Sequence, residues 1–212
     1  MNIVIALFPR LTALDAIGPY EVLQRLPDAT VTFVGHERGE VRTDNGFLGL
    51  TVDRAFDEVP TADVVVIPGG VGTRALMDDD TMLGWIRTMH ETTRFTTSVC
   101  TGSLLLGAAG LLTGLTATTH WAAREELVAT GALAVPQRVV EHLDQRLITA
   151  AGVSSGIDMA LRLSALLVDE TAARAMQLMI EYDPQPPFDS GDAANADEAL
   201  MTRVIEYAET KT

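Results

Sequence analysis

Short apolar runs alternate along the chain with longer segments in which apolar residues recur at helical spacing. The runs are rich in β-branched residues and occupy positions 3–7, 31–34, 64–67, 95–99 and 147–150. Such uninterrupted runs are typical of parallel strands covered on both faces. Helical spacing follows at 18–26, 82–91, 102–109, 122–130, 154–167, 169–182 and 193–209. The alternation predicts an α/β domain with a mostly parallel sheet and helices on both faces.

Turn and proline signals add two details to this prediction. The dipeptide Asn45-Gly46, between 41–42 and 47–52, is a strong signal for a two-residue hairpin turn. We therefore expect a small antiparallel hairpin at one edge of the sheet. Prolines at 184, 186 and 187 end the helix near Tyr182. We expect residues 1–188 to form one α/β domain, and residues 189–212 to form a loop and helix packed on that domain.

Composition limits the classes of partner. The 212 residues are enough for one substantial core, and 15 basic against 29 acidic residues give a formal charge of -14. This charge repels phosphate backbones and anionic lipids, so we expect no nucleic-acid or membrane partner. The amino-terminal residues read as a first strand, without the features of a signal peptide. We expect a cytoplasmic protein that acts on a small molecule.

The sole cysteine, Cys100, lies where a strand pattern changes to a helix pattern, with Gly102 two residues later. A cysteine at such a turn is exposed at the carboxyl end of the sheet, and its sulfur faces the first amides of a helix, which favour the thiolate. The alternative is a buried structural thiol, because free cysteines are among the most buried residues. The strand-turn-helix pattern favours a catalytic nucleophile.

Two glycine-containing strand ends are expected beside this cysteine, because ligands of α/β sheets bind at the carboxyl ends of strands. Gly69 and Gly70 follow the strand at 64–67, and their amides are candidates for stabilising negative charge; the alternative is a plain turn. Gly152 and Val153 follow the strand at 147–150 and are candidates for binding the substrate or stabilising negative charge. We also expect a carbonyl near them to orient the thiol. Either Ser154 or Ser155 is suited to begin the next helix.

A proton-transfer group is expected close to the cysteine. Asp15 follows the first strand and stands just before a helix that Pro19 could begin, so catalysis and helix capping are both open. No histidine is adjacent to Cys100 in sequence or in a metal-ligand spacing, which argues against a metal site. His120, followed by Trp121, reads as an ordinary strand-end residue paired with its neighbours; the alternative is that this pair contacts the crevice. The four histidines are His36, His90, His120 and His142.

With these residues assembled, the chain resembles the DJ-1/PfpI superfamily over nearly its whole length, and within it the isocyanide hydratases. The motifs that carry the resemblance are Leu7-Phe8-Pro9, Leu14-Asp15, Gly18-Pro19, Ile67-Pro68-Gly69-Gly70, Ser98-Val99-Cys100-Thr101-Gly102-Ser103, Ala108-Ala109-Gly110-Leu111-Leu112, Ala117-Thr118-Thr119-His120-Trp121, Gly156-Ile157-Asp158, Glu181-Tyr182 and Pro186-Pro187-Phe188.

The resemblance implies a flavodoxin-like sandwich that forms a homodimer, with Cys100 at a nucleophile elbow near the dimer interface. Peptidase-like members carry a histidine directly after the nucleophile, whereas this chain has Thr101. The branch named for DJ-1 has a glutamate near the cysteine, whereas Asp15 stands in the matching motif here, as in isocyanide hydratases. The implied activity is hydration of an isocyanide to an N-substituted formamide without a cofactor. Cys100 would be the nucleophile, Asp15 the acid and base, and Thr101 a group that binds the intermediate or positions water.

Two other functions stay open on the sequence. One is glyoxalase-like chemistry on aldehydes, because superfamily members with a similar elbow attack carbonyl carbons. The other is a non-enzymatic sensor, through thiol oxidation or ligand binding, because similar motifs occur in the sensing domains of AraC-type transcription regulators. Those regulators carry a basic DNA-binding region after the α/β domain, whereas residues 189–209 of this chain are acidic.

Overall fold

The computed structural model describes residues 1–209. The chain divides into two compact units, Met1–Ile180 and Glu181–Thr212. The predicted packing of residues 189–212 on the α/β domain stays a prediction, and its last three residues lie outside the described part of the chain.

Within residues 1–209, seven strands form the central sheet, in the order β10-β11-β7-β6-β1-β2-β5. All neighbours are parallel except β10 and β11. The five predicted strands are confirmed as β1 (Asn2–Ala6), β2 (Thr30–Gly35), β6 (Val64–Ile67), β7 (Phe95–Val99) and β11 (Leu147–Ala150). Every residue of β6 and β11 is buried, as expected for strands covered on both faces. The sequence did not predict β5 (Arg54–Ala55) or β10 (Val139–His142).

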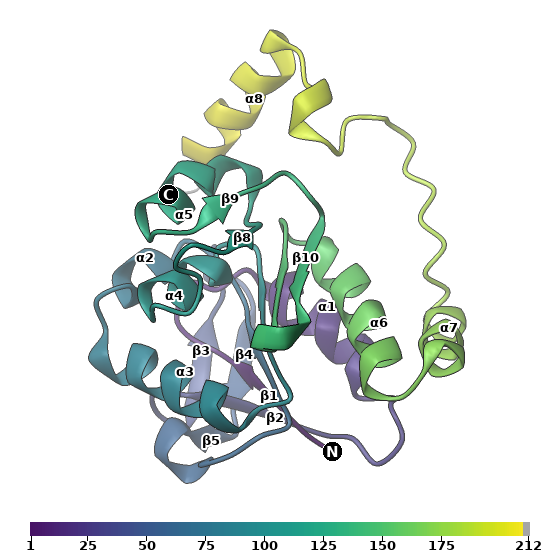
Figure 1. Ribbon diagram of the computed structural model, residues 1–212. Helices are drawn as coiled ribbons and strands as arrows, with labels where there is room; N and C mark the ends of the chain where they lie inside the picture. Colours follow the sequence, from purple (N-terminus) through teal and green to yellow (C-terminus); the bar gives the residue numbers. More distant parts are fainter. Residues whose placement is uncertain (210–212) are drawn as a thin grey trace. The chain divides into compact units, whose positions relative to one another are not determined.

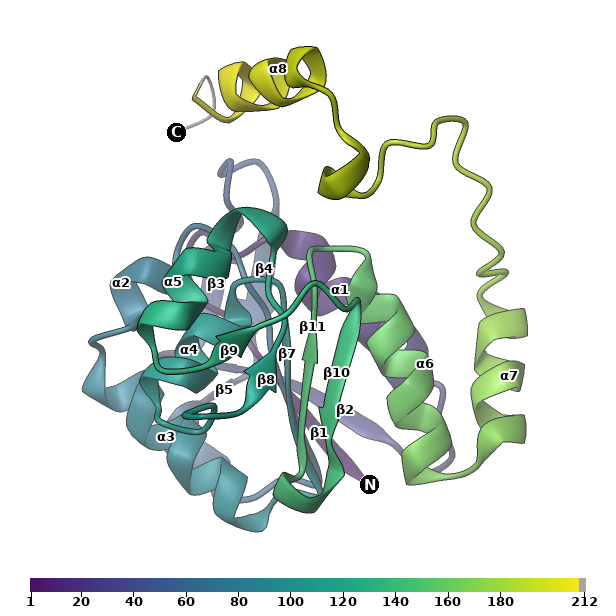
Figure 2. The same cartoon turned by 45° about the horizontal axis from the view of Figure 1, so that its top comes forward.

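Helices cover both faces of the sheet (Figures 1 and 2). On one face, α1 (Ala13–Leu23) packs on α6 (Ser155–Leu167), and α7 (Glu170–Met179) packs on α6. On the other face, α3 (Asp80–Thr92) and α4 (Gly102–Ala108) contact β7. Two short helices, α2 (Thr73–Leu76) and α5 (Arg124–Ala129), and the two-stranded sheet of β8 (Thr116–Ala117) and β9 (Leu133–Ala134) complete this unit. The predicted flavodoxin-like α/β fold is therefore confirmed.

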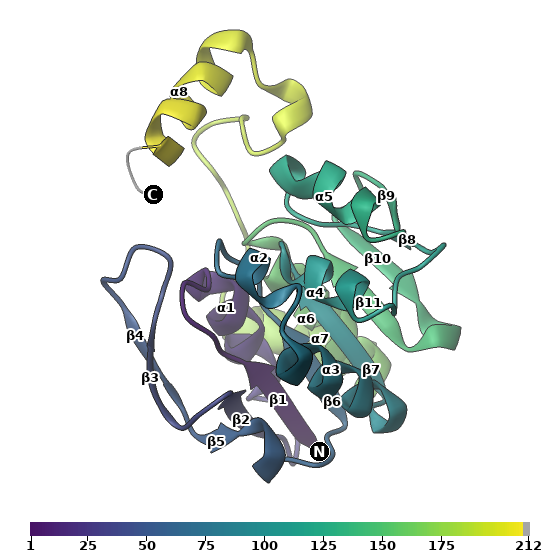
Figure 3. The ribbon, with the colours of Figure 1, turned by 90° about the vertical axis from the view of Figure 1, so that its left-hand side faces the viewer.

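The predicted hairpin is present as β3 (Gly39–Arg42) and β4 (Gly49–Val52), visible at one edge in Figure 3. Its connection is longer than the predicted two-residue turn, because Arg42 pairs with Gly49. Asn45 accepts a hydrogen bond from the Phe47 amide through its side chain, and Gly46 adopts a φ of 76°. These local bonds stabilise a wider turn over residues 43–48.

The start of α1 differs from the prediction. The helix begins at Ala13, and Pro19 lies inside it instead of starting it. Proline lacks an amide proton, so the carbonyl of Asp15, four residues earlier, receives no helical hydrogen bond from it. Because the helix begins at Ala13, Asp15 lies in its first turn and not ahead of it.

The carboxyl-terminal unit holds a short 3-10 turn, Ala193–Asn195, and the helix α8 (Glu198–Glu209). The sequence predicted one helix over 193–209. Asp197 breaks that segment, because its carboxylate accepts a hydrogen bond from the Leu200 amide and so caps a new helix. None of the helices described in residues 1–209 is both long and apolar enough to cross a bilayer.

Candidate active site

Cys100 forms the sharp turn between β7 and α4. Its φ is 57°, a left-handed conformation that costs a non-glycine residue about 1–2 kcal/mol. Its amide is held by two carbonyls of the neighbouring strand end, Ala150 at 3.0 Å and Ala151 at 2.9 Å. The predicted strand-to-helix elbow is therefore present, and hydrogen bonds from β11 maintain the strained residue.

Contacts on the other side of the elbow fix it against β6 and the segment after β8. The Cys100 carbonyl accepts hydrogen bonds from the hydroxyls of Thr119 at 3.0 Å and Ser103 at 3.1 Å. A Cβ on Gly102 would lie 2.1 Å from the Ile67 carbonyl oxygen, so this position requires glycine. The sequence analysis did not single out Thr119, although it lies in one of the quoted motifs.

Asp15 is fully buried, and its side chain contacts the end of β6. Oδ2 accepts a hydrogen bond of 2.9 Å from the Gly69 amide. Oδ1 is buried and has no hydrogen-bond partner among residues 1–209. The N-cap of α1 is Thr12, so the alternative that Asp15 caps a helix is wrong. A buried carboxyl oxygen without a partner is costly to maintain, and such groups are frequent at catalytic sites.

The electrostatics couple Asp15 to Cys100. Burial raises the pKa of Asp15 to about 7, against the lowering effects of the Gly69 amide and of the nearby Cys100 thiol. Burial also raises the pKa of Cys100 to about 12, and the charge of Asp15 adds to this. The amides of Thr101 and Val153 lower the thiol pKa, but by less. In the resting site above neutral pH, the thiol therefore keeps its proton and Asp15 is ionised.

Cys100 is buried, with 5% of its surface exposed, so the expected exposure of the cysteine is wrong. Its raised pKa also contradicts the expectation that helix amides favour the thiolate. The helix that follows, α4, has only seven residues, and its first amides act in a buried site beside a carboxylate. Desolvation and like charge therefore outweigh the amides. A thiol with this pKa needs a proton acceptor before it can react, and the Asp15 carboxyl is the ionisable group beside it.

Gly69 and Gly70 have different roles from those expected. The Gly69 amide is paired with Asp15, and the Gly70 amide donates to the Thr101 hydroxyl at 2.9 Å. That hydroxyl in turn donates to the Gly70 carbonyl at 3.1 Å. Both amides are thus engaged by site residues, so they position Asp15 and Thr101 and do not offer free donors for negative charge. The Thr101 hydroxyl is engaged as well, and only its amide faces the sulfur.

The segment after β11 also differs in detail from the prediction. The Val153 amide, and not a carbonyl, interacts with the Cys100 sulfur. The Gly152 carbonyl accepts from the amide and hydroxyl of Ser155, at 3.1 and 2.9 Å. Val153 has a φ of 39°, a second left-handed residue beside the sulfur. The amides of Thr101 and Val153 are therefore the two donors directed at the reacting atom.

His120 lies against the strand end beside the Cys100 elbow, which favours the alternative that its ring contacts the crevice. A Cβ on Gly152 would be 2.6 Å from His120 Cδ2, so the ring packs directly on the Gly152 backbone. Its Nδ1 accepts from the Ala122 amide at 3.3 Å, which leaves the proton of a neutral ring on Nε2. Burial, with a smaller effect of the Arg74 charge, lowers the pKa of His120 and favours that neutral form.

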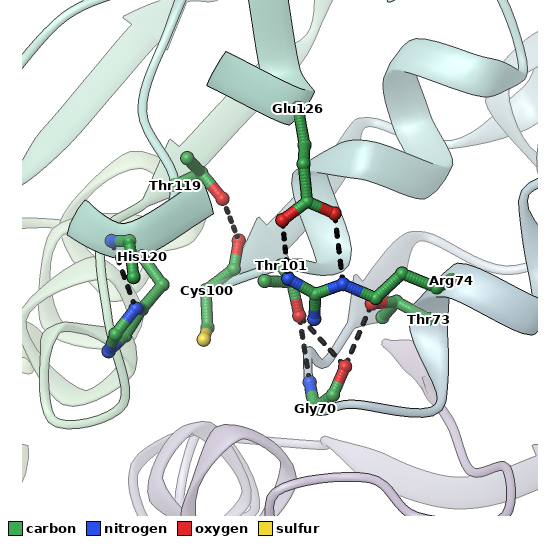
Figure 4. A network of polar contacts seen from close by, with 9 residues as sticks. Gly70, Thr73, Arg74, Cys100, Thr101, Thr119, His120 and Glu126 are labelled. Atoms are coloured by element: carbon green, nitrogen blue, oxygen red, sulfur yellow. Dashed lines mark hydrogen bonds and ion pairs between the residues drawn. The ribbon is translucent and has the colours of Figure 1, made fainter. Parts of the chain in front are cut away.

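An ion pair connects two short helices beside the elbow (Figure 4). Arg74 of α2 donates through Nε and Nη2 to the two carboxylate oxygens of Glu126 in α5, at 2.9 and 2.6 Å. Thr73 donates to the Gly70 carbonyl at 2.8 Å, which joins α2 to the loop that holds Thr101. Because the pair is partly exposed, we expect it to contribute no more than about 1 kcal/mol to stability.

Replacement of Gly69 with alanine tests the close packing of the site. The new Cβ would lie 2.5 Å from the Thr101 nitrogen and 2.9 Å from Asp15 Oδ2, so one of these groups must move. We expect a loss of about 1–3 kcal/mol of stability and a fall of roughly 100-fold in kcat/KM. Urea unfolding and steady-state kinetics measure the two effects.

Gly84→Ala is the matched control, because no atom lies within 4 Å of the position that its Cβ would occupy in α3. We expect this variant to be fully active and about 0.5–1 kcal/mol more stable. Wild-type turnover by Gly69→Ala would show that the spacing of Asp15 and Thr101 does not matter.

Comparisons with known proteins agree with this geometry. Residues 1–166 match the DJ-1/PfpI family. An isonitrile hydratase of Pseudomonas putida is 45% identical over 202 residues, which cover 95% of this chain and 87% of that protein. A crystal structure of a ThiJ/PfpI family protein from Pseudomonas syringae matches with a TM-score of 0.91 and 36% identity, covering 99% of this chain and 86% of that chain.

A third relative belongs to another functional class. The HTH-type transcriptional regulator GbdR of Pseudomonas aeruginosa is 32% identical over 139 residues, which cover 64% of this chain but only 37% of the regulator. The match to the family spans most of the α/β unit, including Asp15, Gly69 and Cys100. From its sequence match and its fold, the chain belongs to the DJ-1/PfpI family.

Proposed function

We propose that this protein hydrates an isocyanide to an N-substituted formamide, with Cys100 as the nucleophile and Asp15 as the acid and base. The observation that carries the proposal is the buried Asp15 carboxyl together with the buried Cys100 thiol at the strained elbow. Burial raises the pKa of Asp15 to about 7 and that of the thiol to about 12. Such a pair delivers a nucleophile and a proton together, and an isocyanide carbon needs both. The 45% identity to an isonitrile hydratase supports the choice of substrate class.

The first half-reaction forms a covalent intermediate. The Cys100 proton passes to Asp15 as the sulfur bonds to the terminal carbon of R–N≡C, and Asp15 then delivers that proton to the same carbon. The product is a thioimidate, R–N=CH–S, which contains every atom of the isocyanide and the thiol. The amides of Thr101 and Val153 stabilise the negative charge that develops on sulfur before the bond forms.

The second half-reaction adds water and releases the enzyme. Asp15 takes a proton from water as the oxygen bonds to carbon, and the nitrogen receives that proton. The C–S bond of R–NH–CH(OH)–S then breaks, and its electron pair leaves with sulfur. The hydroxyl proton returns through Asp15 to sulfur, which gives R–NH–CHO and the thiol. The sum is addition of one water, with no net oxidation or reduction.

Product analysis tests the proposal. Incubation of the full chain with an aryl isocyanide is expected to yield the N-formyl amine, detected by liquid chromatography and mass spectrometry, at a rate far above that of the buffer. A parallel incubation with methylglyoxal measures lactate, the product of the glyoxalase alternative. Lactate without formamide would contradict the hydratase proposal.

The sensor alternative that works by thiol oxidation, as distinct from ligand binding, requires a thiol that oxidises readily. Because burial and the Asp15 charge raise the pKa of Cys100, its thiolate is scarce at neutral pH in the resting site. This weighs against sensing by peroxide. Rapid modification of Cys100 by mild peroxide, with no turnover of any isocyanide, would favour the sensor instead.

A further inference from the structure

The hairpin at the sheet edge is bonded to the segment that leads into the Asp15 helix. Arg10 donates from its amide to the Arg42 carbonyl at 2.7 Å, and Asp44 donates from its amide to the Leu11 carbonyl at 2.9 Å. The Asp44 carboxylate also accepts a 3.1 Å hydrogen bond from the hydroxyl of Thr12. The turn of this predicted hairpin thus places an acidic side chain at the start of α1.

A charge at the start of α1 can change the pKa of Asp15. Thr12 is the N-cap of α1, but its hydroxyl makes no capping bond to the helix and donates to Asp44 instead. The first amides of a helix carry partial positive charge, which favours the ionised form of a carboxyl in the first turn. Asp15 is the acidic residue in the first turn of α1. A second carboxylate at the same helix end opposes that effect.

We propose that Asp44 is a positioning residue for Asp15: its carboxylate offsets the positive end of α1 and so keeps Asp15 able to take up and release a proton near neutral pH. This inference rests on the proposed function, because only a site that transfers protons through Asp15 needs such a residue. Asp44 itself does not touch the sulfur or the reacting atoms in the mechanism above.

Few other charged groups near Asp15 are placed to offset the positive end of α1. Burial is the largest cause of its raised pKa, and Asp44 is the charged residue that raises it further. Cys100, from the elbow, acts in the opposite direction. The charged residues of helix α6, and Arg74 of α2, are engaged in ion pairs: Asp158 with Arg138, Arg162 with Glu141, and Arg74 with Glu126.

Variants of Asp44 distinguish the effect of its charge from a purely structural role. Asp44→Asn keeps an oxygen that accepts from Thr12 and the amide that donates to Leu11, but removes the negative charge and the second oxygen, which accepts from the Asn45 amide at 3.0 Å. Asp44→Glu keeps the charge on a longer side chain. Asp53→Asn is the matched control, because Asp53 is also an aspartate that accepts a hydrogen bond, from the Phe33 amide in β2.

The test is the pH dependence of kcat/KM at low salt. Wild type is expected to lose activity below pH of about 7, as Asp15 is protonated. Asp44→Asn is expected to move this midpoint to lower pH by roughly 0.2–0.7 units, which is the effect of one charge at a helix end. Because Asp44 is partly exposed, the shift is expected to shrink in 1 M salt. Asp44→Glu and Asp53→Asn are expected to keep the wild-type midpoint.

A direct titration separates failure of this inference from failure of the proposed function. Infrared difference spectra follow the carbonyl band of protonated Asp15, identified by its absence in Asp15→Asn, without any substrate. In Asp44→Asn, the pH midpoint of this band is expected to move down by the same amount as the kcat/KM midpoint. This holds even if the protein turns over no isocyanide. Identical Asp15 titrations in Asp44→Asn and wild type, or an equal shift in Asp53→Asn, would overturn the inference.

Discussion

Replacement of Cys100 with serine is expected to abolish formamide production while the chain keeps its fold. The hydroxyl is a far weaker acid than the thiol, and Asp15, with a pKa of about 7, cannot take its proton to a useful extent. Loss of a covalent nucleophile lowers kcat on the order of 10⁴-fold or more. Cys100→Ala is expected to have the same effect, because both variants lose the thioimidate.

Intact-protein mass spectrometry distinguishes loss of the nucleophile from general damage. Wild type quenched during turnover is expected to gain the mass of one isocyanide molecule, and Cys100→Ala to gain nothing. Ser98→Ala is the matched control, two residues earlier in β7. The Ser98 hydroxyl is buried without a partner in the described residues, so its removal is expected to leave turnover intact and to add about 1 kcal/mol of stability. Substantial formamide production by Cys100→Ala would rule out covalent catalysis.

The sequence predicted the central strands well because burial on both faces leaves a continuous apolar run. The run at 64–67 coincides with β6, and that at 147–150 with β11. The edge strand β10 was missed because its four residues, Val139–His142, are only half-buried and mix apolar with charged side chains. Its position depends on antiparallel pairing with β11, which periodicity does not reveal.

The sequence indicated the two side chains proposed to react, but it did not indicate their hydrogen-bond partners. Cys100 was identified from the change of strand to helix, and Asp15 from its place after the first strand. Backbone amides look alike in a sequence, so nothing showed that the Gly69 amide pairs with Asp15 or that the Val153 amide faces the sulfur. Asp44 reads as an ordinary turn residue, and its contact with Thr12 appears only when the hairpin and α1 are placed together.

Replacement of Asp15 with asparagine is expected to stop catalysis and to stabilise the protein. Asparagine keeps an oxygen for the Gly69 amide but can neither accept the thiol proton nor return it. General acid and base catalysis is worth about 10²–10⁴ in rate, and Asp15 acts in both half-reactions, so we expect the upper end of this range. Wild-type turnover by Asp15→Asn would show that another group transfers the protons.

The stability effect has a defined pH dependence, because the folded pKa of Asp15, about 7, lies above its ordinary value of 3.8. Between these two pH values the folded state holds a proton that the unfolded state has released, so stability falls as pH rises from about 4 to about 7. Asparagine has no such proton. Asp15→Asn is therefore expected to equal wild type in stability near pH 4 and to exceed it at pH 8 by a few kcal/mol, about 4 at most.

Urea unfolding at pH 4 and pH 8 measures this difference, with the exposed Asp57→Asn as a control that removes the same charge. A stability gain at pH 8 for Asp15→Asn alone, together with its lost turnover, would mean that the carboxylate is kept at a cost to the fold. Equal stabilities of Asp15→Asn and wild type at pH 8 would contradict the raised pKa on which the proton transfers depend. The two readouts are independent, because unfolding requires no substrate, so the acid-base properties of Asp15 are tested whether or not an isocyanide is turned over.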